Sequence, residues 1–402
     1  MNIIYCINDY AGFNGAGATR ALRLLIALND ELENYRIFCK EYILRDSEKN
    51  DDVIEATGSD IVNEFQKGGY LCIHWIRSNK YELFEEIVKE MKRRKICIPI
   101  VTTVCQKPSF LDAFLTPIEV RFSSVLIFID KTSYNDRYFC FIPTNRKRMI
   151  RFGGYTEGSV RYFEKCLDSI KYDDNKKDCI IYGRGSSLNK CPKDMFDVFD
   201  KINPPKKVLI IGDGEDSWIK REIACRKDKY EIEIMPSLDY KSWILQLALF
   251  DIFLYYLPPT AYSSTDGTML DAMMLKKPVV YYGPDAPKEF LIDGFNSRIA
   301  RSKDELAVIC NELSLNVMER RRLGENARKT VQENMMRETT KLSYMQVYKT
   351  LAFVPPLEIP ILFSMRYYYI ICHSKFCVIY KKIKYYTKIT LYQCYCRIRE
   401  II

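Results

Sequence analysis

The stretch Ser263–Met274, with the sequence SSTDGTMLDAMM, is followed closely by Lys277–Val280, with the sequence KPVV. This pattern predicts a polar loop, then a short helix and then a buried strand. The start of such a helix offers unpaired N–H groups and the positive end of the helix dipole, which together suit a phosphate. Asp271, one turn inside the helix, has a carboxylate that can accept hydrogen bonds from sugar hydroxyls. The stretch therefore predicts half of a nucleotide-binding site.

Apolar strand-like runs alternate with helical periodicity along the chain, which predicts an α/β fold of parallel sheets covered by helices. The first set of strands is expected near residues 2–8, 35–42, 70–76, 98–104, 124–130 and 147–152. The second set is expected near residues 178–184, 207–212, 230–235, 251–257 and 278–282. Two doubly wound domains in tandem would place a cleft between their strand ends, where such sheets bind ligands.

Changes in composition predict where the domains begin and end. A polar stretch at 171–177 has the character of an interdomain linker. The helical pattern near the C-terminus stops at Pro355-Pro356, because proline cannot continue a helix. Composition therefore divides the chain after residue 170 and after residue 354.

The composition describes a globular protein that can bury a large core, since 48% of the 402 residues are hydrophobic and 28% are charged. The fifteen cysteines include no CxxC pair, which favours buried, reduced thiols over a disulfide framework. With only His74 and His373 in the chain, a His-rich metal site is excluded, and we expect no metal. The chain opens directly on a strand and has no run of about 18 apolar residues. We therefore expect a cytoplasmic protein without a signal peptide or a spanning helix.

Other strand ends carry residues that also suit a phosphate. The first strand runs into a glycine-rich turn with Gly15 and Gly17, and a later strand ends on Gly212. Such turns allow close approach of a ligand to the backbone, although local geometry alone also explains them. Arg184 stands at the end of the first strand of the second domain, and Lys190 follows in the loop after it. Two cations at this point suit a diphosphate, whereas two solvated loop charges are the simpler alternative.

Six motifs stand in the order and spacing of one enzyme family: Gly17–Leu22, Ile73–Ile76, Tyr182–Lys190, Ser263–Val279, Ile292–Ser297 and Leu323–Arg328. Together they resemble the retaining glycosyltransferases of family 4, especially the members that build capsule, exopolysaccharide and lipopolysaccharide. The resemblance covers about residues 1–352. It implies the GT-B architecture, in which two Rossmann-like domains face a cleft. Residues 1–170 would be the acceptor side, 171–340 the nucleotide-sugar domain, and 341–354 a helix that returns to the first domain.

Carried over residue by residue, the resemblance implies a donor site that is built from both domains. Arg184 and Lys190 would bind the donor diphosphate, and Asp271 would hold the ribose hydroxyls. Gly15 and Gly17 would lie beneath the phosphate and the reacting sugar. These residues would bind the donor and stabilise its leaving group.

Further donor contacts are implied at Gly212 and at the start of the helix, in Asp266, Gly267 and Thr268. The family has a glutamate at the position of Ser263, which leaves the contacts to the donor sugar open, although Asp266 could substitute physically. Asp271 also departs from the family's glutamate, because its side chain is one methylene shorter.

His74 ends the strand that resembles the family's "lHWi" motif. A lone histidine at the end of a buried strand is usually a packed core residue, and contact with a ligand is the alternative, in which case His74 is a candidate catalytic residue. The family's "TlHD" motif is Thr103-Val104-Cys105-Gln106 in this chain, so a histidine of the acceptor side is missing.

The activity implied is transfer of a hexose, with retention and without a metal, from a UDP- or GDP-linked sugar to a glycan or a lipid-linked acceptor. The nucleotide sugar is a co-substrate, and no other cofactor is expected. Two alternatives stay open. Thr265–Asp271 with Lys277–Tyr282 also resembles polyol-phosphate transferases, which usually carry catalytic histidines. The chain could also be a non-catalytic relative that binds a sugar or a partner.

The tail at 355–402 is the most basic part of the chain. It holds eight Lys/Arg against two Glu, and tyrosines stand between them, whereas the whole chain has a net charge of +9. Basic and aromatic amphipathic segments lie on anionic membrane surfaces, so we expect peripheral attachment to the inner face of the membrane. No nucleic-acid-binding module is visible, so we expect no nucleic acid as a partner. A helical pair packed on the second domain is the alternative.

Overall fold

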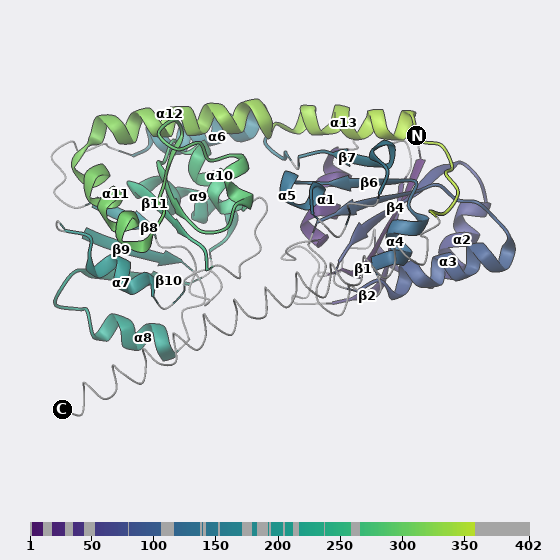
Figure 1. Ribbon diagram of the computed structural model, residues 1–402, viewed down its shortest axis with the longest axis horizontal. Coiled ribbons are helices and arrows are strands. Elements are labelled where there is room, and N and C mark those ends of the chain that lie inside the picture. The colour runs from purple at the N-terminus through teal and green to yellow at the C-terminus, as the bar shows by residue number, and fades with distance from the viewer. Residues whose placement is uncertain are drawn as a thin grey trace. The chain divides into compact units, whose positions relative to one another are not determined.

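The computed structural model describes residues 2–10, 18–28, 35–43, 53–78, 80–105, 116–136, 139, 142–151, 153–170, 179–182, 192, 194–203, 206–211, 217–236, 238–258 and 266–357. The chain forms two compact units, each of which is described by itself (Figure 1). The first unit runs to Gly154 and resumes at Arg337, and the second is Tyr155–Met336.

The first unit is built on a parallel sheet of seven strands in the order β3-β2-β1-β4-β5-β6-β7. The strands are β1 (Asn2–Tyr10), β2 (Tyr35–Tyr42), β3 (Val53–Glu55), β4 (Tyr70–Arg77), β5 (Ile100–Val104), β6 (Val125–Phe128) and β7 (Lys147–Met149). The helices are α1 (Ala18–Leu28), α2 (Gly58–Gln66), α3 (Glu82–Arg94), α4 (Thr116–Phe122), α5 (Lys131–Tyr134) and α13 (Arg337–Lys349), with a 3₁₀ turn at Thr144–Arg146.

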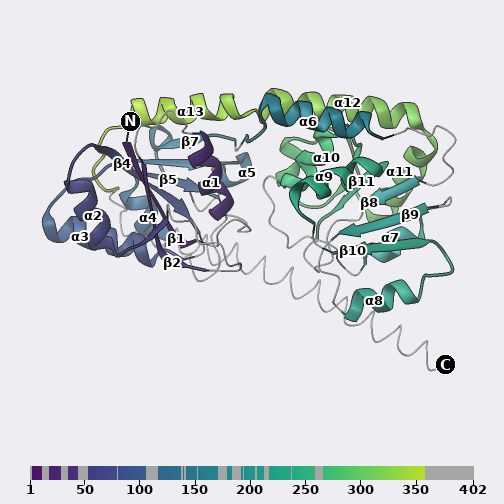
Figure 2. The same ribbon diagram turned by 180° about the vertical axis from the view of Figure 1, so that it is seen from behind.

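Helices cover both faces of this sheet, because successive side chains of a strand point to opposite faces. Ile3, Tyr5 and Ile7 of β1 pack with α1 and α13, whereas Ile4 and Cys6 pack with α2 and α3. Figure 2 shows α2 and α3 together on one side and α13 on the other. The first unit is therefore a doubly wound domain, as expected.

The second unit has a parallel sheet of six strands in the order β10-β9-β8-β11-β12-β13. The strands are β8 (Cys179–Tyr182), β9 (Lys206–Ile211), β10 (Glu231–Met235), β11 (Ile252–Tyr256), β12 (Val279–Tyr282) and β13 (Ser297–Ile299). The helices are α6 (Glu157–Asp168), α7 (Met195–Asp200), α8 (Ser217–Ala224), α9 (Tyr240–Leu249), α10 (Gly267–Met274), α11 (Lys303–Leu315) and α12 (Val317–Asn334), with a 3₁₀ turn at Ala286–Glu289.

This second sheet is also covered on both faces. One core packs α6, α9, α10 and α12 against Leu209 and Phe253, and the other packs α7, α8 and α11 against Val208 and Ile252. The predicted α/β fold with parallel sheets in two domains is therefore confirmed. Within the described ranges, every helix is too short or too polar to cross a lipid bilayer.

The division between the units falls earlier in the chain than the linker expected at 171–177, which lies outside the described residues. Helix α6 precedes that linker, yet its Val160 and Phe163 pack in the core of the second unit. The return to the first unit comes at Arg337, at the start of α13. The core that each helix joins thus decides where the units divide.

The strand order reverses once in each sheet. In the first unit the reversal lies between β1 and β4, and in the second it lies between β8 and β11. Open α/β sheets bind ligands outside the carboxyl ends of the strands at such a switch point. The topology therefore marks one edge position in each unit as a place for a ligand.

Candidate functional site

Helix α10 begins at the switch point of the second unit, after β11. Its N-cap is Asp266, a residue type favoured there because its carboxylate accepts the N–H groups at the helix start. Oδ1 of Asp266 accepts the Thr268 N–H at 3.0 Å and the Thr268 hydroxyl at 2.6 Å. Oδ2 accepts the Tyr255 hydroxyl at 3.2 Å. Gly267, between Asp266 and Thr268, is the first residue of α10.

This cap differs from the phosphate site expected at the helix start. The Thr268 N–H is already bonded to the chain's own carboxylate, and a negative charge stands where the dipole would favour an anion. A phosphate at the same point would meet electrostatic repulsion from Asp266. The helix start is better suited to hydroxyl groups than to a diphosphate.

Asp271 lies one turn further along α10 and is only 3% exposed. Its Oδ1 accepts two tyrosine hydroxyls, that of Tyr155 at 2.7 Å and that of Tyr240 at 3.1 Å. Burying a carboxylate is costly unless hydrogen bonds satisfy it, and these two bonds do so while they fix its orientation. Tyr240 opens α9, and Tyr155 precedes α6. Sequence reasoning found Asp271 but neither tyrosine.

Six of the predicted site residues lie outside the described residues: Gly15, Gly17, Arg184, Lys190, Gly212 and Ser263. The described strands nevertheless fix the points from which their segments leave the sheets. β8 ends at Tyr182, two residues before Arg184, and β11 is hydrogen-bonded beside it, with Phe253 opposite Tyr182. The chain therefore leaves two neighbouring parallel strands at the same edge of the sheet, once shortly before Arg184 and once shortly before Ser263.

His74 lies inside β4, not at the strand end as expected, and is completely buried in the first unit. Its Nδ1 lies 2.6 Å from the Tyr348 hydroxyl, and its Nε2 lies 2.7 Å from Oγ1 of Thr103. Burial lowers the pKa of His74 to about 3, so the ring is neutral near pH 7. Because Tyr348 belongs to α13, the histidine joins α13 to β4 and β5. These contacts favour the packing role of His74 over contact with a ligand.

A buried ion pair lies at the carboxyl end of β4. Nε of Arg77 is 2.7 Å from Oε2 of Glu119, and Nε1 of Trp75 donates to Oε1 of the same glutamate at 2.6 Å. Both partners of the ion pair are at most 3% exposed. The pair ties α4 to β4, and it shows that the arginine at this strand end has a structural partner.

No protein-family model matches the sequence, and no curated protein matches it either. The fold does match solved structures. Anabaena HepE in complex with UDP-glucose is 15% identical, with a TM-score of 0.64 over 87% of this chain and 100% of HepE. Sucrose-phosphate synthase from Thermosynechococcus elongatus is 14% identical, with a TM-score of 0.62 over 87% of this chain and 98% of that one. The lipopolysaccharide outer core galactosyltransferase WaaB is 12% identical, with a TM-score of 0.61 over 87% and 100%.

This chain has the GT-B fold. The expectation drawn from the six motifs is thereby confirmed for the architecture. Of its described candidate residues, the GT-B chain carries four in the second unit at the edge that the strand order selects, namely Asp266, Gly267, Thr268 and Asp271, and carries His74 in the first unit.

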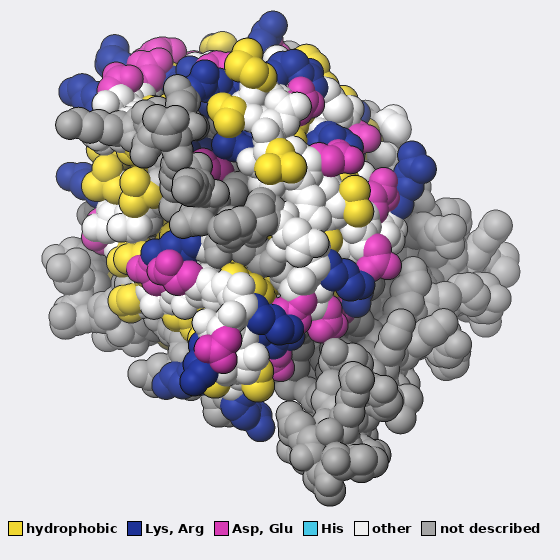
Figure 3. Space-filling model, turned by 90° about the vertical axis from the view of Figure 1, so that its left-hand side faces the viewer, with side chains coloured by type: hydrophobic (Ala, Val, Ile, Leu, Met, Phe, Trp, Pro, Cys, Tyr) yellow, Lys and Arg dark blue, Asp and Glu magenta, His cyan; other side chains and the backbone are white. Residues whose placement is uncertain are grey.

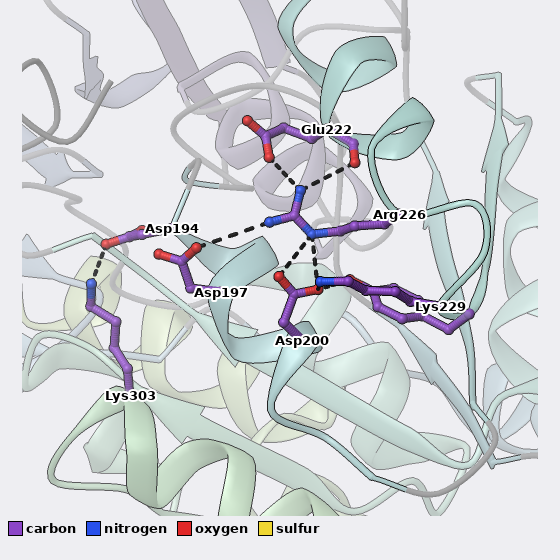
Figure 4. Close-up of polar contacts among 8 residues, drawn as sticks. Asp194, Asp197, Asp200, Glu222, Arg226, Lys229 and Lys303 are labelled. Carbon is purple, nitrogen blue, oxygen red and sulfur yellow. Dashed lines mark hydrogen bonds and ion pairs between the residues drawn. The ribbon is translucent and has the colours of Figure 1, made fainter. Parts of the chain in front are cut away.

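A cluster of charged side chains in the second unit of the GT-B chain surrounds α7 (Figure 4). Nε of Arg226 contacts both carboxylate oxygens of Asp200, at 3.0 and 3.1 Å, and Nη1 contacts Oε2 of Glu222 at 2.6 Å. Asp194 accepts from Lys303 and from the Tyr256 hydroxyl. Every carboxylate of the cluster has a basic partner, so its role is to hold α7 between α8 and α11.

The face shown in Figure 3 mixes Lys and Arg with Asp and Glu among its described side chains. Interspersed charges of both signs are typical of a solvated surface. Among the described residues, no group of three or more His, Cys, Asp and Glu is placed to hold a metal ion. In the second unit, the described features that single out a site are the switch point and the carboxylates of Asp266 and Asp271.

Proposed function

We propose that this chain is a glycosyltransferase that moves a sugar from a nucleoside diphosphate to a glycan or a lipid-linked acceptor, with retention. One observation carries the proposal: β8 and β11 are neighbours at the reversal of strand order. The segment with Arg184 and Lys190 follows β8, and the segment from Ser263 to Asp271 follows β11. Two motifs that suit a diphosphate and a ribose thus follow the two strands that flank the switch point of the second unit, where the fold favours a ligand.

The comparisons support a sugar nucleotide as donor. HepE was solved with UDP-glucose, and WaaB is described as a galactosyltransferase. Their likeness to this chain lies in the fold, so we transfer to it only the class of donor, a UDP- or GDP-linked hexose. Our proposal takes this donor as co-substrate and requires no further cofactor.

The proposed chemistry needs positive charge at the leaving group. When the bond between the sugar and the diphosphate breaks, the diphosphate gains negative charge. Arg184 would bind it as a planar fork and Lys190 as a point charge, in place of a metal ion. One preorganised hydrogen-bond donor of this kind lowers the activation barrier by about 3 kcal/mol.

Asp271 would hold the ribose hydroxyls at the other end of the nucleotide. Its carboxylate is kept in one orientation by Tyr155 and Tyr240, so little reorganisation is needed when a ribose arrives. This division of roles, with cations after β8 and carboxylates on α10, avoids the repulsion between a phosphate and Asp266.

A non-catalytic sugar-binding role is the second candidate, and the hydrogen bonds of Asp266 favour it. Asp266 could replace the glutamate missing at Ser263 only if its carboxylate were available to a sugar. It already accepts three hydrogen bonds, from the Thr268 N–H and from the hydroxyls of Thr268 and Tyr255. The polyol-phosphate alternative is weaker, because His74 is buried with a partner on each ring nitrogen.

Arg184→Ala and Lys190→Ala test the proposed chemistry. Each should lower sugar transfer by about 100-fold or more, because each removes one preorganised charge from the leaving group. Release of UDP or GDP from nucleotide sugars measures turnover, and NMR of the product measures the anomeric configuration. Lys220→Ala, on the exposed face of α8, is the matched control and should leave turnover unchanged. Wild-type turnover in Arg184→Ala or Lys190→Ala would contradict the proposal.

We further propose that the basic tail attaches the protein to anionic membranes on their cytoplasmic side. Each basic residue near an anionic surface contributes about 1 kcal/mol. Residues 358–402 lie outside the described chain, and the described part ends in contacts with the first unit. The Leu357 N–H donates to the Arg121 carbonyl at 2.8 Å, and Arg146 donates to the Pro355 carbonyl at 2.7 Å.

These contacts give the point at which to truncate. Removal of residues 358–402 keeps Leu357 and Pro355 and should abolish co-sedimentation with vesicles that contain anionic lipid. Vesicles of neutral lipid are the control. Equal sedimentation of the truncated and the full chain would contradict membrane attachment through the tail.

A further inference from the structure

Two tyrosines bond to the same oxygen of Asp271 but differ in exposure. Tyr155 and Tyr240 both donate to Oδ1 of Asp271. Tyr155 is 9% exposed, whereas Tyr240 is 54% exposed. One hydrogen bond therefore fixes a buried ring, and the other fixes a ring that stays largely in contact with solvent.

The position of Tyr240 in the fold places it at the ligand edge. Tyr240 is the first residue of α9, which follows β10, and α10 follows β11 of the same parallel sheet. Helices that follow parallel strands begin at the carboxyl ends of those strands, where ligands bind. Asp239 fixes this helix start, because it accepts the N–H groups of Lys241 and Ser242 at 3.0 and 3.2 Å.

We infer that Tyr240 contacts the base of the donor nucleotide and that its bond to Asp271 sets the position of its ring. The inference rests on the proposed function, since it takes Asp271 as the partner of the ribose. The base is joined directly to the ribose. The base would therefore lie close to the ring of Tyr240, because the Tyr240 hydroxyl is bonded to Asp271, the carboxylate that would hold the ribose.

The chemistry of the ring suits a base. An aromatic side chain stacks on the face of any nucleobase, so the contact adds affinity for UDP and GDP alike. A Tyr ring has few rotatable bonds, and the bond to Asp271 restricts it further, so little conformational entropy is lost on contact. Tyr240 is thus a nucleoside-binding residue, separate from the residues that bind the diphosphate.

Calorimetric titration of the full chain with UDP, GDP and pyrophosphate tests this assignment. Tyr240→Ala should weaken the binding of UDP and GDP by about tenfold, which is the usual loss for one stacking contact. It should leave pyrophosphate binding within twofold of wild type, because pyrophosphate has no base. Tyr240→Phe keeps the ring and should bind both nucleotides within about threefold of wild type.

Two control variants separate the base contact from general effects. Leu245→Ala removes another exposed side chain of α9, 45% exposed, and should not change nucleotide binding. Tyr155→Phe removes the other hydrogen bond to Oδ1 of Asp271 and leaves the exposed ring of Tyr240 in place. It should lower the thermal stability and have little effect on nucleotide affinity.

The outcomes distinguish the inference from the proposed function. If wild type binds UDP or GDP and Tyr240→Ala binds them equally well, the inference is wrong and the proposed function stands. An equal loss for pyrophosphate, or a loss in Tyr240→Phe as large as in Tyr240→Ala, would also overturn the base contact. If wild type binds no nucleoside diphosphate, the proposed function fails and the inference fails with it.

Discussion

Asp271 combines two tasks in one carboxylate. It satisfies the hydroxyls of Tyr155 and Tyr240, and we propose that it also receives the hydroxyls of a ribose. The first task is structural, because it joins α10 to α9 and to the segment before α6. The second is functional, because it orients a nucleotide. The two tasks can be separated by substitutions that differ in their ability to accept a hydrogen bond.

Asp271→Ala should destabilise the second unit by about 1–3 kcal/mol, because the buried Tyr155 hydroxyl loses its acceptor. It should also weaken UDP or GDP binding about tenfold. Asp271→Asn keeps a carbonyl oxygen for both tyrosines, so its stability should stay within about 1 kcal/mol of wild type. It should bind nucleotide less tightly than wild type, since a neutral acceptor bonds a hydroxyl about half as strongly. Urea unfolding and calorimetry measure the two effects.

Wild-type nucleotide affinity in Asp271→Ala would contradict the ribose role. Equal loss of stability in the two variants would contradict the account of the tyrosine bonds. Asp271 was predictable because its motif is local: a carboxylate one turn into a helix that follows a strand. Tyr155 and Tyr240 were not, because their partnership with Asp271 exists only after α9, α10 and the segment before α6 have packed together.

At the scale of elements, Gly324 of α12 lies against the turn that follows α10. A Cβ on Gly324 of α12 would lie 1.9 Å from the carbonyl oxygen of Lys276, in the turn after α10. Lys276 itself has a positive φ of 54°, and Lys277 donates to the Ala248 carbonyl at 2.7 Å, so the turn is held from both sides. The glycine therefore sets how closely α12 packs against the helix that carries Asp266 and Asp271.

Gly324→Ala should destabilise the second unit, because the backbone of one element must move away from the other. The expected cost is about 1–3 kcal/mol, the usual range for overpacking, reduced by the better helix propensity of alanine. Thermal or urea unfolding measures it. Gly158→Ala in α6 is the control, since its Cβ would meet only Oγ1 of Thr156, at 3.5 Å. A stability of Gly324→Ala equal to or above that of wild type would contradict this account.

The longer strands were predictable from pattern alone, and two of the three-residue strands were not. Runs of buried Ile, Val and Cys located β1, β4 and β12, because strands covered on both faces are apolar at nearly every position. β3 and β13 were missed, whereas β7, which also has three residues, was expected as part of a longer run at 147–152. The role of α13 was expected only from the resemblance, because its partner His74 is remote in sequence.

At the scale of the whole molecule, two doubly wound units are built from one chain, and each has a switch point. In the second unit that point lies between β8 and β11, whose following segments hold the cations and the carboxylates of the proposed donor site. The alternation of strand and helix patterns predicted two α/β domains, but it could not predict the strand order. That order depends on which helices cover which faces, and it is what brings the separate motifs to one edge.

A thermal-shift screen of nucleotide sugars tests the central claim most directly, because a ligand that binds only the folded protein stabilises it. A bound donor at 100 times its Kd would add about 2.7 kcal/mol to the stability of the wild-type chain. We predict that a UDP- or GDP-linked hexose raises the Tm of wild type and that the Arg184→Ala, Lys190→Ala double variant, with an unchanged Tm in the absence of ligand, loses this shift. No shift with any nucleotide sugar, or an equal shift in the double variant, would contradict the account.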